Sequence, residues 1–149
     1  MGKLHDLFDK EQGITLDDIK KLIDNKVQES STLEYTIYTE NSEQHKINII
    51  KSIVGFLNKP NFESSLLVIG VHTEKGKRTK MPKEIEPVLN NILNETQLRQ
   101  IITENIGSIP RYKTLPHFDV ITVDTNSIKA ESSVFLVEVE SDPRAFYYS

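Results

Sequence analysis

A continuous apolar run, SLLVIGV at residues 65–71, constrains the fold of this chain more than any other feature. Five of its seven residues are large aliphatic residues, and no polar residue alternates with them after Ser65. A strand with one solvated face alternates between polar and apolar residues, whereas a strand covered on both faces is apolar throughout. The run therefore predicts the central strand of a sheet with structural layers packed on both sides.

Two helices are predicted before this strand. The first covers residues 15–25, because Thr15 can cap it, Asp18 follows three residues later, and apolar residues recur at helical spacing. The second covers residues 41–59, where the apolar arc is broad enough to lie against a sheet and Pro60 ends the helix.

Between these helices, residues 32–39 (TLEYTIYT) alternate as a half-buried strand does. The face expected to pack on the core carries Leu33, Tyr35 and Ile37. Glu34 lies on the opposite face, so we expect it to point toward a groove or toward water. Glu29 precedes the strand and can reach the same side if the chain bends there.

The second half of the chain mixes helices and strands. We expect two short helices, then two strands that form an antiparallel pair, and then a short edge strand in the tail. These segments are IEPVLNNILN (85–94), TQLRQIITENIG (96–107), FDVITVD (118–124), SVFLVEVE (133–140) and DPRAFYYS (142–149). In the tail we expect one of the two tyrosines, Tyr147 and Tyr148, to pack inward and the other to face out.

This order of elements predicts an α+β (mixed α/β) fold, in which one compact domain has a mixed sheet packed by helices. A length of 149 residues fits a single domain, which we place at residues 1–149 with residues 1–13 as an N-terminal extension. The chain has no cysteine, secretory leader or apolar run of membrane-spanning length, so we expect a cytoplasmic protein without membrane contact.

Charge is distributed unevenly along the chain. The net charge is −4, yet the segment KGKRTKMPK at residues 75–83 carries five basic residues and no acidic one. The rest of the chain is therefore at −9. Such segregation fits a strip that contacts phosphates on an acidic body, and it also fits a solvated loop.

Several chemistries have no candidate residues. There is neither a Gly-x-Gly-x-x-Gly pattern nor a P-loop, so we expect no nucleotide cofactor. There is no Gly-x-Ser-x-Gly and no thiol for acyl transfer. The four histidines are widely separated and show no His-x-x-x-His pairing.

Three segments in order, LIDNKVQESSTLEY, IIKSIVGFLN and LLVIGV, carry a resemblance to a known family. The chain resembles the AlbA-type domain shared by Schlafen proteins and many prokaryotic proteins, over about residues 15 to 148. The resemblance implies a nucleic-acid-binding domain. In the Schlafen branch it further implies a metal-dependent endoribonuclease that acts on structured RNA such as tRNA. Glu29 and Glu34 fall on the two glutamate positions of that branch, as catalytic residues and metal ligands.

The chain departs from the family pattern next to the central strand. The family places an acid directly after Ile-Gly-Val, where this chain has His72, Thr73 and then Glu74. The two glutamates are expected to hold Mg²⁺ or Mn²⁺. His72 is a further candidate ligand, for a softer ion such as Mn²⁺ or Zn²⁺, and Glu74 is another. The lysine that the family has after its second glutamate and aromatic residue is Thr36, and FESS replaces the family's Gly-Gly.

Basic side chains supply the candidate contacts to nucleic acid, with RNA preferred to DNA as the partner. The residues expected to contact phosphates are Lys51, Lys75, Lys77, Arg78, Lys80 and Arg144. An alternative of another class remains open, namely a non-catalytic module that binds a protein or forms a homodimer and has lost the nuclease chemistry.

Overall fold

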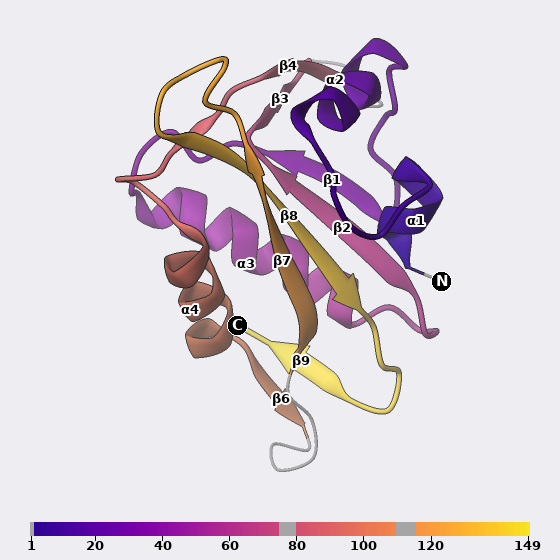
Figure 1. The fold of residues 1–149 in the computed structure, drawn as a ribbon. Helices are drawn as coiled ribbons and strands as arrows, with labels where there is room; N and C mark the ends of the chain where they lie inside the picture. Colours follow the sequence, from indigo (N-terminus) through magenta and orange to yellow (C-terminus); the bar gives the residue numbers. More distant parts are fainter. Residues whose placement is uncertain (1, 75–79, 110–115) are drawn as a thin grey trace.

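A five-stranded mixed sheet forms the centre of the molecule, and helices cover both of its faces (Figure 1). The computed structural model describes residues 2–74, 80–109 and 116–149. Its elements are α1 (Lys3–Phe8), α2 (Leu16–Asp24), β1 (Leu33–Thr36), α3 (Glu43–Leu57), β2 (Ser64–Ile69), β3 (Val71–Thr73), β4 (Pro82–Ile85), β5 (Val88–Leu89), α4 (Glu95–Asn105), β6 (Gly107–Ile109), β7 (His117–Asp124), β8 (Ser132–Glu140) and β9 (Phe146–Tyr148). The predicted α+β fold is confirmed.

Strand β2 is the central strand that the apolar run predicts. It pairs with β1 in parallel and with β8 in antiparallel orientation. The long strand β7 and the short strand β5 also pair with β8. Leu67 and Ile69 of β2 are buried in one hydrophobic cluster, and Leu66 and Val68 are buried in another. The sheet is therefore covered on both faces.

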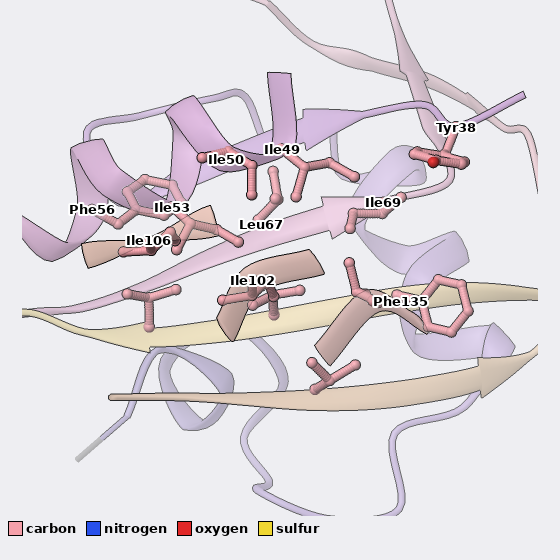
Figure 2. Packing of buried hydrophobic residues seen from close by; sticks show 14 of the residues in the cluster. Tyr38, Ile49, Ile50, Ile53, Phe56, Leu67, Ile69, Ile102, Ile106 and Phe135 are labelled. Atoms are coloured by element: carbon pink, nitrogen blue, oxygen red, sulfur yellow. The ribbon is translucent and has the colours of Figure 1, made fainter. Parts of the chain in front are cut away.

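Helices α3 and α4 cover the first face. Figure 2 shows side chains of α3 pointing at Leu67 and Ile69 of β2, and Ile102 of α4 and Phe135 of β8 belong to the same cluster. The hydroxyl of Ser42 accepts the backbone N–H of His45 at 3.2 Å and caps α3 at its first turn. The broad apolar arc read from the sequence is the side of α3 that faces this core.

Helices α1 and α2 cover the second face, where Ile19 of α2 is completely buried. The N–H of Thr15 donates to Asp18 Oδ2 at 2.8 Å, as the capping pattern predicts. The expected N-terminal extension carries α1, whose Leu4 is buried in the same cluster and donates its N–H to Glu138 Oε2 at 2.9 Å. Residues 2–24 are thus part of the packed domain.

The helix predicted for residues 85–94 is wrong. This segment contains the end of β4, all of β5 and a turn. Val88 pairs with Ser133 of β8, which places its side chain in the first cluster without a helical turn. Pro87 has no N–H to give to a helix, and it restricts Glu86 to extended backbone. Tertiary pairing therefore overrides the apolar spacing of this segment.

Gly70 redirects the chain at the end of β2. Its φ of +118° belongs to backbone that residues with a side chain rarely adopt, and a Cβ there would lie 3.0 Å from Val134. Its N–H donates to Thr36 O at 2.8 Å, and its carbonyl accepts the N–H of Glu86 at 2.8 Å. The chain then enters the β3–β4 hairpin, and the basic segment at residues 75–83 contains most of the connection between these two strands.

The tail forms the short strand that its sequence predicts. β9 pairs with β6 in a separate two-stranded sheet, with Tyr147 buried and Tyr148 partly exposed. A Cβ at Gly107 would meet the ring of Tyr148 at 2.6 Å, so this glycine allows the close approach of the two strands. The side-chain amide of Asn58 donates to Tyr147 O at 2.8 Å and accepts from Tyr147 N at 2.7 Å, which ties β9 to the end of α3.

Side chains of α4 form hydrogen bonds with the outer edge of β7. Arg99 donates to the carbonyl of Val120 at 3.1 Å and to the Asp119 carboxylate at 3.0 Å, and Thr122 donates to Glu95 at 2.7 Å. In the part of the chain that is described, β7 has β8 as its only strand neighbour. No helix in this part has the length and apolar character needed to cross a bilayer.

Candidate functional site

A pocket of ≈ 500 Å³ lies at the edge of the sheet, between β1, α3 and the start of β4. It brings together two carboxylates and two ammonium groups from four separate parts of the chain. The residues that line it are Glu29, Glu34, Tyr35, Thr36, Asn48, Lys51, Ser52 and Lys80. Four of the residues named from sequence (Glu29, Glu34, Lys51 and Lys80) therefore lie together.

Glu34 reaches the pocket through the alternation of β1. Its neighbours Leu33 and Tyr35 are buried in the second cluster, so Glu34 faces the α3 side of the sheet. There its Oε2 accepts the hydroxyl of Ser52 at 2.6 Å. This hydrogen bond holds the carboxylate in one orientation at the wall of the pocket.

Glu29 reaches the same pocket from the segment before β1. Its N–H donates to Lys80 O at 2.8 Å, and its Oε2 accepts the N–H of Tyr35 at 3.0 Å. Burial raises the pKa of the Glu29 carboxyl above its usual range, and the Tyr35 N–H and the Lys80 ammonium offset only part of that effect. The charge of Glu34 raises the pKa of Glu29 further.

The bend that carries Glu29 back over β1 is held by Tyr35. Its hydroxyl donates to Val27 O at 2.6 Å, while its ring lies in the second cluster with α1 and α2. Burial raises the pKa of Tyr35, so the hydroxyl stays protonated and remains a donor. One residue therefore links the α2 side of the molecule to the position of the Glu29 carboxylate.

The positive charges come from two different walls of the pocket, α3 and the segment before β4. Lys51 extends from the exposed side of α3, and Lys80 lies exposed before β4. The Lys80 carbonyl is fixed by the N–H of Glu29, so the basic segment and the first glutamate are joined through the backbone. Lys75, Lys77 and Arg78 lie outside the described residues.

Three other residues predicted from the sequence do not line this pocket. His72 lies in β3 opposite Glu84, and Glu74 follows β3 with its N–H donated to Met81 O at 3.0 Å. Arg144 lies near the far end of α3, where two of its nitrogens bond both oxygens of Asp142 at 2.9 Å. That guanidinium lowers the pKa of Asp142 to about 2.

The sequence reasoning missed Asn48, Ser52 and Thr36 as parts of the site. Asn48 and Ser52 are one helical turn apart on α3, and Lys51 lies between them on the same polar side. A polar stripe at this spacing on a helix whose opposite side is apolar was the available signal. Thr36 could be placed from its alternation with Glu34.

The two glutamates form a partial donor set for a divalent cation. One oxygen of each carboxylate accepts a hydrogen bond, from Tyr35 or from Ser52, which leaves the other oxygen for a ligand. Mg²⁺ is often held by one or two carboxylates together with water and substrate phosphates. Within the described ranges, no three histidine or acidic residues come together in a way that could hold a metal ion. The two carboxylates alone are therefore an incomplete ligand set, which would need water or phosphate oxygens to complete it.

Neutralising Glu29 is expected to stabilise the fold at neutral pH. Glu29→Gln keeps an oxygen for the Tyr35 N–H and removes the charge that burial disfavours. Because the pKa of Glu29 is raised on folding, its stability penalty is present above the raised pKa and absent below the usual value of 4.5. We expect the Tm to rise by about 1–3 °C at pH 7.5, with the gain disappearing by pH 4.

Thermal unfolding of both proteins between pH 4 and pH 8 measures this difference. The matched control is Glu11→Gln, because Glu11 is exposed and lies outside the pocket. An equal gain in both variants, or a gain for Glu29→Gln that persists at pH 4, would contradict the assignment of a raised pKa to the half-buried Glu29 carboxyl.

The chain matches a known family. The family model described as Schlafen, AlbA_2 matches residues 29–149, which begin at Glu29 and extend through β9. No curated protein matches the chain. The matched range contains every residue that lines the pocket with Glu29 and Glu34, and all of the first hydrophobic cluster. Helices α1 and α2 lie before the matched range.

Proposed function

The chain belongs to the Schlafen, AlbA_2 family, a family of nucleic-acid-related domains, and from this membership we propose that it binds structured RNA and cleaves it with a divalent cation. The observation that carries the proposal is the pocket in which Glu29 and Glu34 lie with Lys51 and Lys80. Ammonium groups bind phosphates, and paired carboxylates bind the cation that phosphoryl chemistry uses.

Each group has a separate role in this proposal. Lys51 and Lys80 hold the RNA backbone from the two walls, so that one phosphate lies over the carboxylates. Glu29 and Glu34 would hold the cation, because Tyr35 and Ser52 each engage only one oxygen of these carboxylates. Mg²⁺ or Mn²⁺ would neutralise charge on the phosphoryl oxygens and lower the pKa of a bound water.

RNA is preferred to DNA as the substrate in this proposal because the resemblance to the Schlafen branch implies structured RNA. The pocket is open at the edge of the sheet, which suits a strand that runs across it. The pocket is formed where the polar side of α3 meets the face of β1 that carries Glu34.

Removing the lysines is expected to weaken RNA binding and its dependence on salt. Each lysine that contacts a phosphate displaces about one counterion, so Lys51→Ala and Lys80→Ala should each lower the slope of log Kd against log salt by about 1. We expect the affinity for a tRNA to fall by about three- to tenfold per lysine at 100 mM salt.

Fluorescence anisotropy with labelled tRNA at 50–200 mM salt measures both quantities. The matched control is Lys20→Ala, because Lys20 is exposed on α2 and lies outside the pocket. Equal slopes for the pocket variants and the control would remove this pocket from the interface. A wild-type protein that binds neither tRNA nor duplex DNA at 50 mM salt would refute the proposed function.

A second candidate function is a module that binds a protein or pairs with another copy without chemistry. A groove of ≈ 470 Å³ between α3 and α4 favours it, because the groove mixes polar and apolar walls and exposes Ile47. Light scattering after size exclusion separates the two candidates. A dimer that Ile47→Asp dissociates would support this second function, and a monomer at all concentrations would contradict the pairing.

A further inference from the structure

The end of the molecule near the C-terminus of α3 presents aromatic rings to solvent. Phe62 is 67% exposed and Phe146 is 60% exposed. Tyr148 is on the same side of β9 as Phe146, because residues two apart in a strand share a face. Of the exposed large hydrophobic side chains in residues 2–74, 80–109 and 116–149, these three are the aromatic ones.

Phe146 borders a concave site of ≈ 530 Å³, which we call the aromatic hollow. The residues that line it with Phe146 include Arg144 and two prolines, Pro60 and Pro143, which are rigid and lack an N–H. Arg144 also lies over the ring of Phe62, with 5.5 Å between its Cζ and the ring centroid. Arg144 therefore connects the two exposed phenylalanines.

The two loops that form this hollow are tied together by Ser141, which is almost fully buried. Its hydroxyl accepts the N–H of Glu63 at 2.8 Å and bonds the carbonyls of Asn61 and Glu63. Its N–H donates to Glu63 O at 2.8 Å. Asn58 joins the end of α3 to β9 in the same region. The rings thus stand on a fixed frame, which lowers the entropy cost of stacking a ligand.

The chemistry of the hollow selects a flat ring in preference to an isolated phosphate. The charge of Arg144 is balanced by both oxygens of Asp142, so the guanidinium offers mainly its flat face. Lys59 lines the same hollow and supplies a positive charge beside the rings. A flat ring attached to an anionic backbone matches both features, and a nucleotide in a strand has this composition.

We propose that the aromatic hollow is a stacking site for an unpaired nucleobase of the bound RNA, with Phe146 and Arg144 against the base and Lys59 on its phosphate. This inference rests on the proposed function and extends it, because it assigns single-stranded RNA to a second surface. Ser52 of α3 lines the pocket with Glu29 and Glu34, and Asn58, the residue that caps the C-terminus of α3, lines the hollow. The two are six residues apart, or about 9 Å along the helix axis. A strand with a stacked rise of about 3.4 Å per nucleotide covers that distance in about three nucleotides.

The test compares a single-stranded 12-nucleotide RNA with a blunt duplex RNA of the same sequence, by anisotropy at 50 mM salt. The variants are Phe146→Ala and the double variant Phe62→Ala/Phe146→Ala. Ile128→Ala serves as a control for an exposed apolar side chain elsewhere. The affected rings are exposed, and thermal unfolding of each variant checks that the fold is kept. We expect the double variant to lose about tenfold or more in affinity for the single strand and less than twofold for the duplex.

Two outcomes with the double variant would overturn the stacking site while leaving the proposed function in place. One is unchanged single-strand affinity in the double variant when Lys51→Ala and Lys80→Ala still weaken binding. The other is an equal loss on single strand and duplex, which would indicate a general effect on the interface. If the wild-type protein binds tRNA but not the single strand, the stacking site alone fails, and if it binds no RNA, tRNA included, the proposed function and the stacking site both fail.

Discussion

Replacing Glu34 with glutamine is expected to lower the rate of cation-dependent RNA cleavage by about 100-fold or more. The amide keeps an oxygen for the Ser52 hydroxyl and leaves the fold of β1 intact, but it removes one of two negative charges that would hold Mg²⁺ or Mn²⁺. RNA binding should persist or tighten slightly, because a negative charge beside the phosphate is lost. Single-turnover cleavage of labelled tRNA at about 1–10 mM cation measures the rate, and anisotropy measures the affinity.

The specificity of this effect is checked with Glu11→Gln, which removes an equal charge outside the pocket. The control should cleave at the wild-type rate. Cleavage that is unchanged in both Glu34→Gln and Glu29→Gln would show that the carboxylates are not the catalytic centre. A variant whose affinity fell together with its rate would place Glu34 in RNA binding.

Replacing Ile19 with alanine is expected to lower the free energy of unfolding by about 2–4 kcal/mol. Ile19 is completely buried where α2 packs on the second face of the sheet, so the truncation leaves a cavity beneath β1 and β2. In a chain of this size the Tm should fall by about 6–12 °C. Urea unfolding followed by circular dichroism gives the free energy directly.

The neighbouring exposed residue of α2 provides the control. Lys20→Ala makes a substitution of the same kind on the solvent side of the helix and should change the free energy by less than about 0.5 kcal/mol. Equal effects of the two variants would mean that α2 does not pack on the sheet. A large effect confined to Ile19 would show that residues before the family match contribute to the stability of the domain.

The fold was predictable where a single physical rule decided the structure. The run at 65–71 is apolar because both faces of β2 are covered, and the arc of α3 is broad because the helix lies on a sheet. Prediction failed at residues 85–94. There the apolar residues are spaced as in a helix, but strand pairing of Val88 with Ser133 determines the structure. It also missed α1, which is six residues long and is held by a distant carboxylate, Glu138. Contacts between residues far apart in sequence leave no local signal.

The candidate site was predictable to a similar degree and for similar reasons. The period of two in β1 placed Glu34 on the groove side, and charge counting drew attention to Lys80. Glu29 and Lys80 come together through a backbone hydrogen bond between segments about fifty residues apart in the sequence. No local sequence pattern indicates such a bond. His72 was a reasonable candidate at the end of a central strand, but Gly70 redirects the chain into the β3–β4 hairpin, where His72 lies opposite Glu84 and does not line the pocket.

Arg99 has a consequence for how this protein behaves at high concentration. A strand at the edge of a sheet can pair with a strand from another molecule if its backbone groups are free, and the sheet then continues across molecules. Among the described residues, β7 is an edge strand of eight residues. Here the carbonyl of Val120 is already engaged by Arg99, and Asp119 adds a charge that would have to be dehydrated. At Val120, therefore, a side chain from α4 occupies the backbone group that a strand of another molecule would need, and α4 lies on the opposite side of the sheet from α1 and α2.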